Sequence, residues 1–156
     1  GDEPLVRIGT SDGKTHLGCV ALGSHPEGGF VDVALVRLST ALEGAETPAL
    51  RCGASPLAVG TEVRSEGFPN SLEGIESVPI AAWGRIAALP YHLRDTPWAI
   101  PVYAAQMPVG HGDSGGPVFA PDGRIFAIIV GHNQEQPSWS VLQPIEPVCQ
   151  ILAWRA

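Results

Sequence analysis

The stretch Gly110-His111-Gly112-Asp113-Ser114-Gly115-Gly116-Pro117 places one serine among closely spaced glycines, with an aspartate before it and a proline at its end. Glycine adopts backbone angles that other residues resist, so such a run can turn its own N–H groups inward. Two inward N–H groups beside a serine hydroxyl form an oxyanion hole next to a nucleophile, as acyl transfer requires. An ordinary glycine-rich surface turn is the alternative. The unbroken run of specified positions at 112–117 favours the catalytic interpretation.

The same run fits Gly-x-Ser-x-Gly, the nucleophile elbow of α/β-hydrolases, in which the serine follows a strand and opens a helix. Here the residues after Gly116 predict a strand, a turn at Pro121-Asp122-Gly123-Arg124 and a second strand, which together form a hairpin. Because a hairpin and not a helix follows the serine, the elbow is excluded.

The motif at 112–117 resembles the Gly-Asp-Ser-Gly-Gly-Pro motif of the chymotrypsin-like (trypsin-fold) serine proteases, and the chain is closest in character to the bacterial trypsin-like peptidases. Upstream, Asp32-Val33-Ala34-Leu35 looks like the family's Asp-Ile-Ala-Leu segment, which carries the triad aspartate. The resemblance covers the chain well from Asp32 to the end and only loosely before it. It implies an all-β, two-lobed antiparallel β-barrel fold with a short C-terminal helix, and the activity of a serine endopeptidase.

The resemblance also implies roles for single residues. Ser114 is the nucleophile that forms the acyl-enzyme, and Asp32 orients the triad histidine. The backbone N–H groups of Gly112 and Ser114 form the oxyanion hole. Asp113 is structural, and in relatives activated by proteolytic processing it pairs with the new N-terminal amine.

The primary specificity pocket is assigned by the same resemblance to Pro108, Val130 and His132. Pro108 stands where trypsins have an aspartate, so a preference for Arg or Lys is not supported. We expect this pocket to bind a small or apolar side chain of the substrate. Because His132 can carry a positive charge, an acidic substrate side chain remains an alternative.

Composition and turn signals predict how the chain is organised. A hydrophobic content of 44% over 156 residues is enough for one substantial core, and 19 Gly and 15 Pro favour short strands with many turns. We predict a partial N-terminal barrel lobe over 1–45 that carries Asp32, a connector over 46–60, and a C-terminal barrel lobe over 61–156. The predicted strands lie near 4–9, 15–22, 30–38, 62–64, 77–89, 99–106, 119–130 (a hairpin) and 139–142. A helix is predicted over 144–154, with Ile145, Val148, Ile151 and Leu152 on one face.

The triad histidine is missing from the expected place. A serine hydroxyl needs a neighbouring base, and in the family that histidine precedes the aspartate by several tens of residues. Residues 1–31 contain no Thr-Ala-Ala-His-like segment, and only three strand candidates precede the connector where the family has a six-stranded barrel. We therefore expect a missing or separate N-terminal segment, or a companion chain, to supply the histidine and the first strands. A catalytically inactive, peptide-binding relative and a compact protease with an internal base remain alternatives.

The histidines within the chain are each expected to be ordinary surface or loop residues. His16 is the leading internal candidate for the base, although it lies in a strand pattern. The others are His25 before Asp32, His111 beside the oxyanion glycine, and His92 and His132 in predicted loops.

The cysteines Cys19, Cys52 and Cys149 are too few, and odd in number, for a disulfide framework. Cys19 and Cys149 are expected to be buried free thiols. Cys52 lies on the link between the lobes, where some two-chain members of the family bond a separate N-terminal peptide. The balance favours a reducing compartment, and hence a bacterial cytoplasm, with secretion left open.

Charge and hydropathy limit the partners. The net charge of −7 argues against nucleic acid, which needs a basic face. No apolar run is long enough to span a membrane. No His, Cys and Asp spacing resembles a metal site, and no cofactor is expected. The expected partner is a protein or peptide substrate.

Overall fold

The computed structural model describes residues 5–9, 15–24, 30–38, 43–69, 78–92, 100–132 and 139–155. Most of these residues are in β-strands, and one short helix lies near the C-terminus. The all-β fold with a terminal helix, predicted from the sequence, is confirmed. His25 lies outside the described residues.

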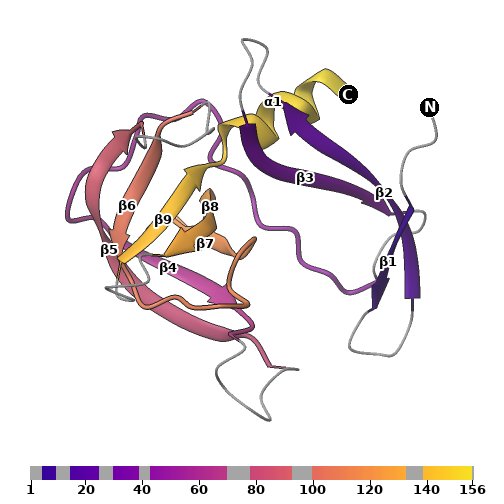
Figure 1. The fold of residues 1–156 in the computed structure, drawn as a ribbon, viewed down its shortest axis with the longest axis horizontal. Coiled ribbons are helices and arrows are strands. Elements are labelled where there is room, and N and C mark those ends of the chain that lie inside the picture. Colours follow the sequence, from indigo (N-terminus) through magenta and orange to yellow (C-terminus); the bar gives the residue numbers. More distant parts are fainter. Residues whose placement is uncertain are drawn as a thin grey trace.

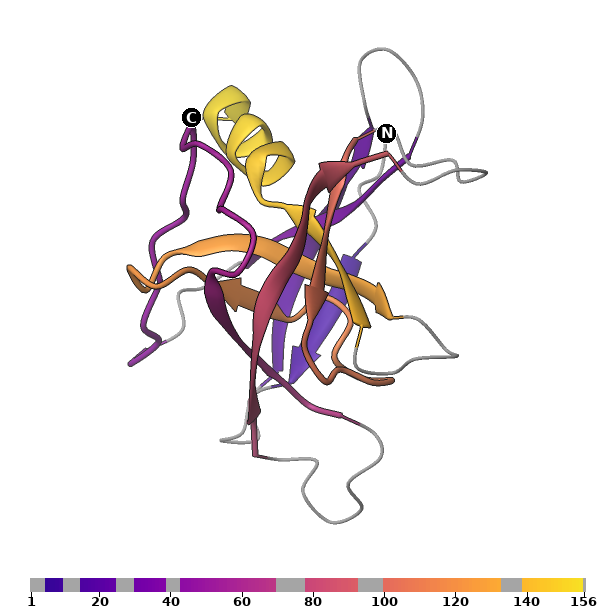
Figure 2. The same ribbon diagram turned by 90° about the vertical axis from the view of Figure 1, so that its left-hand side faces the viewer.

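Six strands form a closed antiparallel barrel in the order β4-β5-β6-β9-β8-β7 (Figures 1 and 2). Closure leaves no long unpaired edge in this part of the chain. The strands are β4 (Glu62–Gly67), β5 (Ile80–Tyr91), β6 (Val102–Gln106), β7 (Pro117–Phe119), β8 (Ile125–His132) and β9 (Trp139–Pro144). The strand, turn and strand expected after Ser114 are present as β7, residues 120–124 and β8.

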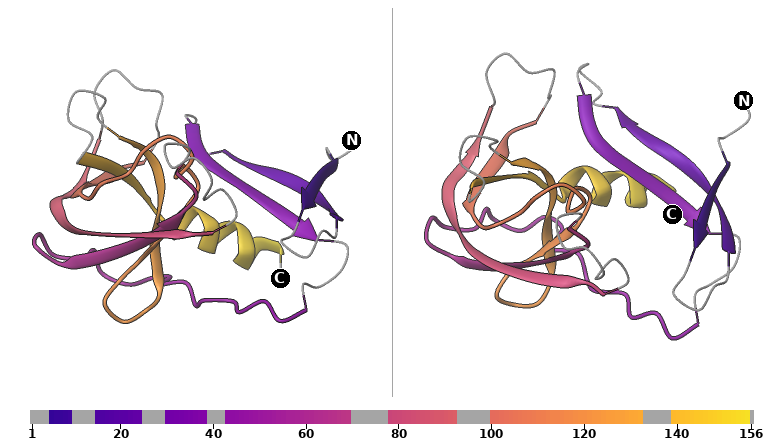
Figure 3. Two further views of the ribbon diagram at one scale, coloured as in Figure 1. Left: turned by 90° about the horizontal axis from the view of Figure 1, so that it is seen from below. Right: turned by 60° about the horizontal axis from the view of Figure 1, so that its bottom comes forward.

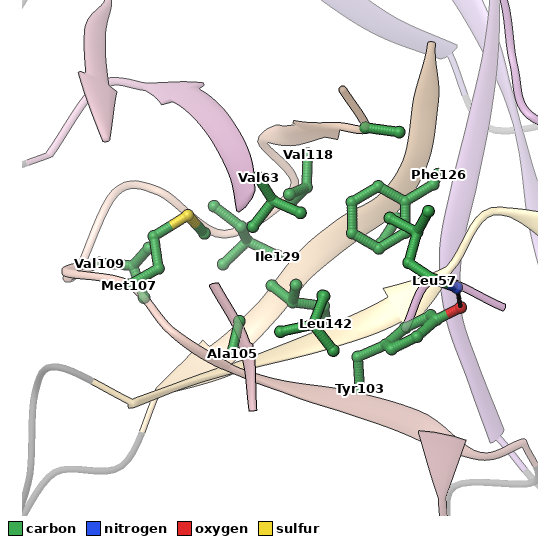
Figure 4. Close-up of a cluster of buried hydrophobic side chains, with 13 residues drawn as sticks. Leu57, Val63, Tyr103, Ala105, Met107, Val109, Val118, Phe126, Ile129 and Leu142 are labelled. Atoms are coloured by element: carbon green, nitrogen blue, oxygen red, sulfur yellow. Dashed lines mark hydrogen bonds between the residues drawn. The ribbon is translucent and has the colours of Figure 1, made fainter. Parts of the chain in front are cut away.

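The barrel interior is filled by alternating side chains from its strands (Figure 4). From β6 onward Tyr103, Ala105, Met107 and Val109 are buried, whereas Gln106 and Pro108 between them are exposed, as period-2 alternation requires. Figure 4 shows Met107 and Val109 at one end of the cluster and Tyr103 with Phe126 at the other. The Tyr103 hydroxyl accepts the N–H of Leu57 at 3.2 Å, and burial raises the pKa of this phenol above its ordinary value.

The N-terminal part is a three-stranded antiparallel sheet in the order β1-β2-β3. It consists of β1 (Leu5–Gly9), β2 (Thr15–Ser24) and β3 (Phe30–Leu38). The described N-terminal residues thus form an open sheet and not a closed barrel, as the strand count predicted. Along β3, Val31 and Val33 are buried, whereas Asp32 and Ala34 are exposed on the opposite face.

The helix α1 (Glu146–Arg155) lies between the barrel and the N-terminal sheet (Figure 3). Ile145 and Val148 pack with Val31 and Val33 of β3 in a second apolar cluster. Leu152, predicted on the buried face, is 47% exposed, because the neighbouring Ile151 and not Leu152 packs against this cluster. No helix in the described part of the chain is long and apolar enough to cross a membrane.

The prediction for two of the cysteines is wrong. Cys52 and Cys149 form a disulfide, with an S–S distance of 2.04 Å and Cα atoms 5.8 Å apart. The bond forms because the start of α1 lies against the connector, where the N–H of Gly53 also donates to Glu146 Oε2 at 3.1 Å. Cys149 is therefore not a free thiol, and Cys52 does not bond a separate peptide. Since disulfides persist in oxidising compartments, the cysteines no longer support a reducing one.

Replacing both Cys52 and Cys149 by serine is expected to lower the free energy of unfolding by about 4–5 kcal/mol. A bond between residues 97 apart in sequence removes much of the conformational freedom of the unfolded chain. Urea unfolding of the oxidised protein and of the double variant measures the difference. A reducing agent should destabilise the wild type equally and leave the variant unchanged. Equal stability of the oxidised wild type and the variant would contradict the prediction.

Candidate active site

The predicted nucleophile turn, residues 110–117, connects β6 to β7 over one end of the barrel core. Buried Met107 and Val109 anchor its start, and buried Val118 anchors its end. Ser114 between them is exposed. Packing on both sides of the turn thus leaves Ser114 at the protein surface.

Asp113 is buried, and its hydrogen bonds connect two other residues of the turn. Its Oδ2 accepts the N–H of Gly110 at 2.9 Å, and its own N–H donates to the carbonyl of Gly110 at 3.2 Å. Its carbonyl accepts the N–H of Gly116 at 2.9 Å. The partners described for Asp113 are therefore backbone groups of the turn.

The turn is also bonded to β8. The N–H of Gly115 donates to the carbonyl of Ile129 at 2.8 Å, and the N–H of Ile129 donates to the carbonyl of Gly116 at 3.0 Å. Gly112 has a φ of 98° and Gly115 a φ of 85°, a region that side chains with a Cβ rarely adopt. Among the described residues, the N–H groups of Gly112 and Ser114 donate to no backbone carbonyl.

The end of β4 packs directly against the nucleophile turn. A Cβ built on Gly67 would lie 2.4 Å from Asp113 Oδ1, closer than real Cβ atoms approach any oxygen. A Cβ on Gly116 would lie 2.8 Å from the carbonyl oxygen of Asp113 and 2.9 Å from that of Glu66. A side chain at position 67 would therefore displace the Asp113 carboxylate.

Gly67→Ala is expected to displace the Asp113 carboxylate, and with it the amides of the turn. We expect about 1–3 kcal/mol of destabilisation from the overpacking and a fall in kcat of about 100-fold in the folded fraction. Gly60→Ala in the connector is the matched control, since the φ of 87° at Gly60 is strained for alanine and no atom lies within 4 Å of the added Cβ. The control should lose stability but keep its kcat. Unfolding curves and peptide turnover separate the two, and equal kcat in both variants would contradict this role of Gly67.

Asp32 is joined to the barrel through its backbone, while its side chain is exposed. The N–H of Asp32 donates to Gln143 Oε1 at 2.9 Å, and Gln143 Nε2 donates to the carbonyl of Asp32 at 3.3 Å. Gln143 stands opposite Ile128 in the β8–β9 ladder, and the adjacent Ile129 holds the nucleophile turn. Sequence analysis missed Gln143, which lies on the outer face of the barrel in the alternation of β9.

The predicted specificity residues lie on two segments. Pro108 is exposed just before the nucleophile turn, whereas Val130 and His132 are half-buried near the end of β8. His132 is in a strand, so its assignment to a loop was wrong. Its ring meets that of His111 edge to face, with centroids 5.2 Å apart, which brings the end of β8 against the nucleophile turn.

For the remaining histidines, we give only the position in the secondary structure. His16 is in β2 opposite Ile8, and His92 is exposed directly after β5. Between residues that the structure describes, no hydrogen bond joins Ser114 to a histidine. The described chain therefore shows a nucleophile turn and a candidate triad aspartate without a bonded base.

A cavity of about 550 Å³ lies at the junction of the connector, the start of β6 and α1. It is mainly apolar, and its lining includes Arg51, Tyr103, Phe126 and Ile145. Its described lining contains no residue of the nucleophile turn, so it is separate from the candidate active site.

A closed six-stranded antiparallel barrel, a C-terminal helix and a Gly-Asp-Ser-Gly-Gly-Pro turn before β7 define the chymotrypsin-like class of fold. Residues 3–128 match the family model of the trypsin-like peptidase domain, and the chain belongs to this family. A search among curated proteins finds no significant match.

Solved structures share the fold at low identity. A serine-to-alanine mutant of Rv3671c from M. tuberculosis H37Rv, in the inactive form, aligns with a TM-score of 0.65 and 22% identity, over 94% of this chain and 68% of that one. The active form of the Rv3671c protease aligns with a TM-score of 0.65 and 21% identity, over 89% and 62%. The HtrA-type protease AlgW with a decapeptide aligns with a TM-score of 0.72 and 16% identity, over 96% and 43%. The chain thus spans less than half of the AlgW chain and about two thirds of the Rv3671c chains.

Proposed function

We propose that this chain forms part of a serine endopeptidase that hydrolyses peptide bonds through an acyl-enzyme on Ser114. The nucleophile turn is the observation that supports this most directly. Ser114 is exposed, the turn is held from inside by buried Asp113, and the amides of Gly112 and Ser114 have no described carbonyl partner. A surface turn without a catalytic role has no need of this combination.

In the proposed mechanism Ser114 Oγ attacks the scissile carbonyl while a histidine takes its proton. Asp32 holds the histidine in the required tautomer and stabilises the imidazolium. The N–H groups of Gly112 and Ser114 bind the oxyanion, each contributing about 3 kcal/mol. We propose that the histidine comes from a segment N-terminal to residue 1 or from a companion chain. The open three-stranded sheet formed by the described N-terminal residues supports this.

The proposed substrate is an extended peptide bound along the end of β8. β7 pairs with β8 only as far as Ile128, so the segment 130–132 has no partner on that side among the described residues of β7. A peptide can add to such an edge by backbone hydrogen bonds. With the uncharged residues Pro108 and Val130 in the predicted specificity pocket, we propose a small or apolar side chain at the cleaved bond.

A peptide-binding module without hydrolytic activity is the second candidate. It is favoured by the lack of a described hydrogen bond from Ser114 to a histidine. Both candidate functions involve a bound peptide. The AlgW structure, which shares the fold, contains a decapeptide.

Incubation of the full-length protein with a peptide library, followed by mass spectrometry of the products, distinguishes the two functions. The endopeptidase should cut after small or apolar residues. Saturable binding of peptides by folded, full-length protein without any cleavage would support the binding module and contradict the proposed enzyme.

A further inference from the structure

The side chain of Gln143 is a buried polar group outside the described mechanism. Gln143 is 2% exposed, although Leu142 beside it, at 0%, faces the barrel interior and leaves Gln143 on the outer face. A carboxamide removed from water needs partners for its oxygen and its nitrogen. β3 of the N-terminal sheet covers this position and supplies both.

The oxygen and the nitrogen of the Gln143 carboxamide both form hydrogen bonds with the backbone of Asp32. The oxygen accepts the N–H of Asp32 at 2.9 Å, and the nitrogen donates to the carbonyl of Asp32 at 3.3 Å. This double exchange is the pattern of a hydrogen-bonded pair in an antiparallel ladder, with a side-chain amide in place of a peptide group. The other edge of β3 pairs with β2, so Gln143 occupies the edge that faces the barrel.

We propose that Gln143 is a positioning residue that sets the register of β3 against the barrel and so holds the Asp32 carboxylate relative to Ser114. The inference depends on the proposed function, in which Asp32 and Ser114 act together. Only a few backbone contacts separate Gln143 from the nucleophile turn. Gln143 pairs with Ile128 on β8, and the next residue, Ile129, exchanges hydrogen bonds with the nucleophile turn.

The apolar contact described between these parts does not set a register. Val31 and Val33 meet Ile145 and Val148 in an apolar cluster. Such packing is non-directional and tolerates sliding of β3 along its axis. A slip by one residue would turn Asp32 to the opposite face of the strand. A directional amide bonded to the backbone of Asp32 opposes that slip.

Gln143→Met in the full-length protein tests the proposal, because it keeps the length of the side chain and removes both hydrogen bonds. We expect kcat for peptide hydrolysis to fall about 10- to 100-fold with little change in KM, since a small misplacement of a catalytic group costs this much. Ser140→Ala is the matched control. Ser140 is 1% exposed on the same strand, and its hydroxyl bonds the Ala105 carbonyl within the barrel at 3.2 Å. It should lose stability and keep its kcat.

A double-mutant cycle shows whether Gln143 acts through Asp32. Once the carboxylate is removed by Asp32→Asn, Gln143→Met should cost no further activity. An equal loss of kcat in both backgrounds, or unchanged kcat in Gln143→Met alone, would overturn the proposal. If Gln143→Met does not fold, Gln143→Asn, whose amide is one methylene short of Asp32, is measured in the same way.

Amide hydrogen exchange tests the same contact without using activity. Exchange at the Asp32 amide should be slow in the wild type and in Ser140→Ala, and at least about tenfold faster in Gln143→Met. Equal exchange rates in all three would overturn the proposed contact. If the wild type hydrolyses no peptide, the proposed function fails, and hydrogen exchange alone decides whether Gln143 holds β3.

Discussion

Ser114→Ala in the full-length protein is expected to lower kcat/KM for peptide hydrolysis by on the order of 10⁴- to 10⁶-fold. The substitution removes the hydroxyl that forms the acyl-enzyme and leaves the oxyanion-binding amides in place. Because Ser114 is exposed, the thermal midpoint should change little. Turnover of a peptide taken from the cleavage profile is the measurement.

Ser55→Ala, which removes an exposed hydroxyl from the connector, is the control for Ser114→Ala and should leave turnover unchanged. If Ser114→Ala kept more than a hundredth of the wild-type activity, Ser114 would not be the nucleophile.

Asp32→Asn is expected to lower kcat by about 10⁴-fold, because an amide can neither hold the histidine in the required tautomer nor stabilise the imidazolium. The change is nearly isosteric, and the hydrogen bonds to Gln143 come from the backbone of residue 32 and so remain. Folding should therefore be preserved. Initial rates of peptide hydrolysis across a range of pH measure the loss.

Asp122→Asn makes the same chemical change at a distance from the candidate site. Asp122 is an exposed residue whose pKa is held below its ordinary value by hydrogen bonds from Arg124. Turnover by this variant should equal that of the wild type. Wild-type turnover in Asp32→Asn would remove Asp32 from the triad.

The parts of the fold that follow from local signals were predictable. Period-2 alternation and the Pro121-Asp122-Gly123-Arg124 turn predicted the hairpin after the nucleophile, and this excluded the hydrolase elbow. The strand near 99–106 was predicted too, although the residues of this segment that fill the barrel were identified only in the structure. The predicted boundaries at 45 and 60 and the catalytic roles of the site residues remain predictions.

The features that the sequence did not predict depend on packing between distant segments. Cys52 and Cys149 meet only because α1 returns to the connector, and no spacing rule anticipates a contact across 97 residues. Gln143 reads as a solvent-facing residue of β9 until β3 is placed over it. His111 and His132 come together only when the nucleophile turn folds against β8.

The central claim is that the hydroxyl of Ser114 is an activated nucleophile beside the amides of Gly112 and Ser114. Treatment of the full-length protein with a fluorophosphonate probe, followed by intact-mass and peptide analysis, tests this most directly. The proposed mechanism predicts a single covalent adduct on Ser114 that is absent from Ser114→Ala and forms much more slowly in Asp32→Asn. Folded, full-length protein that forms no adduct at Ser114 would contradict it.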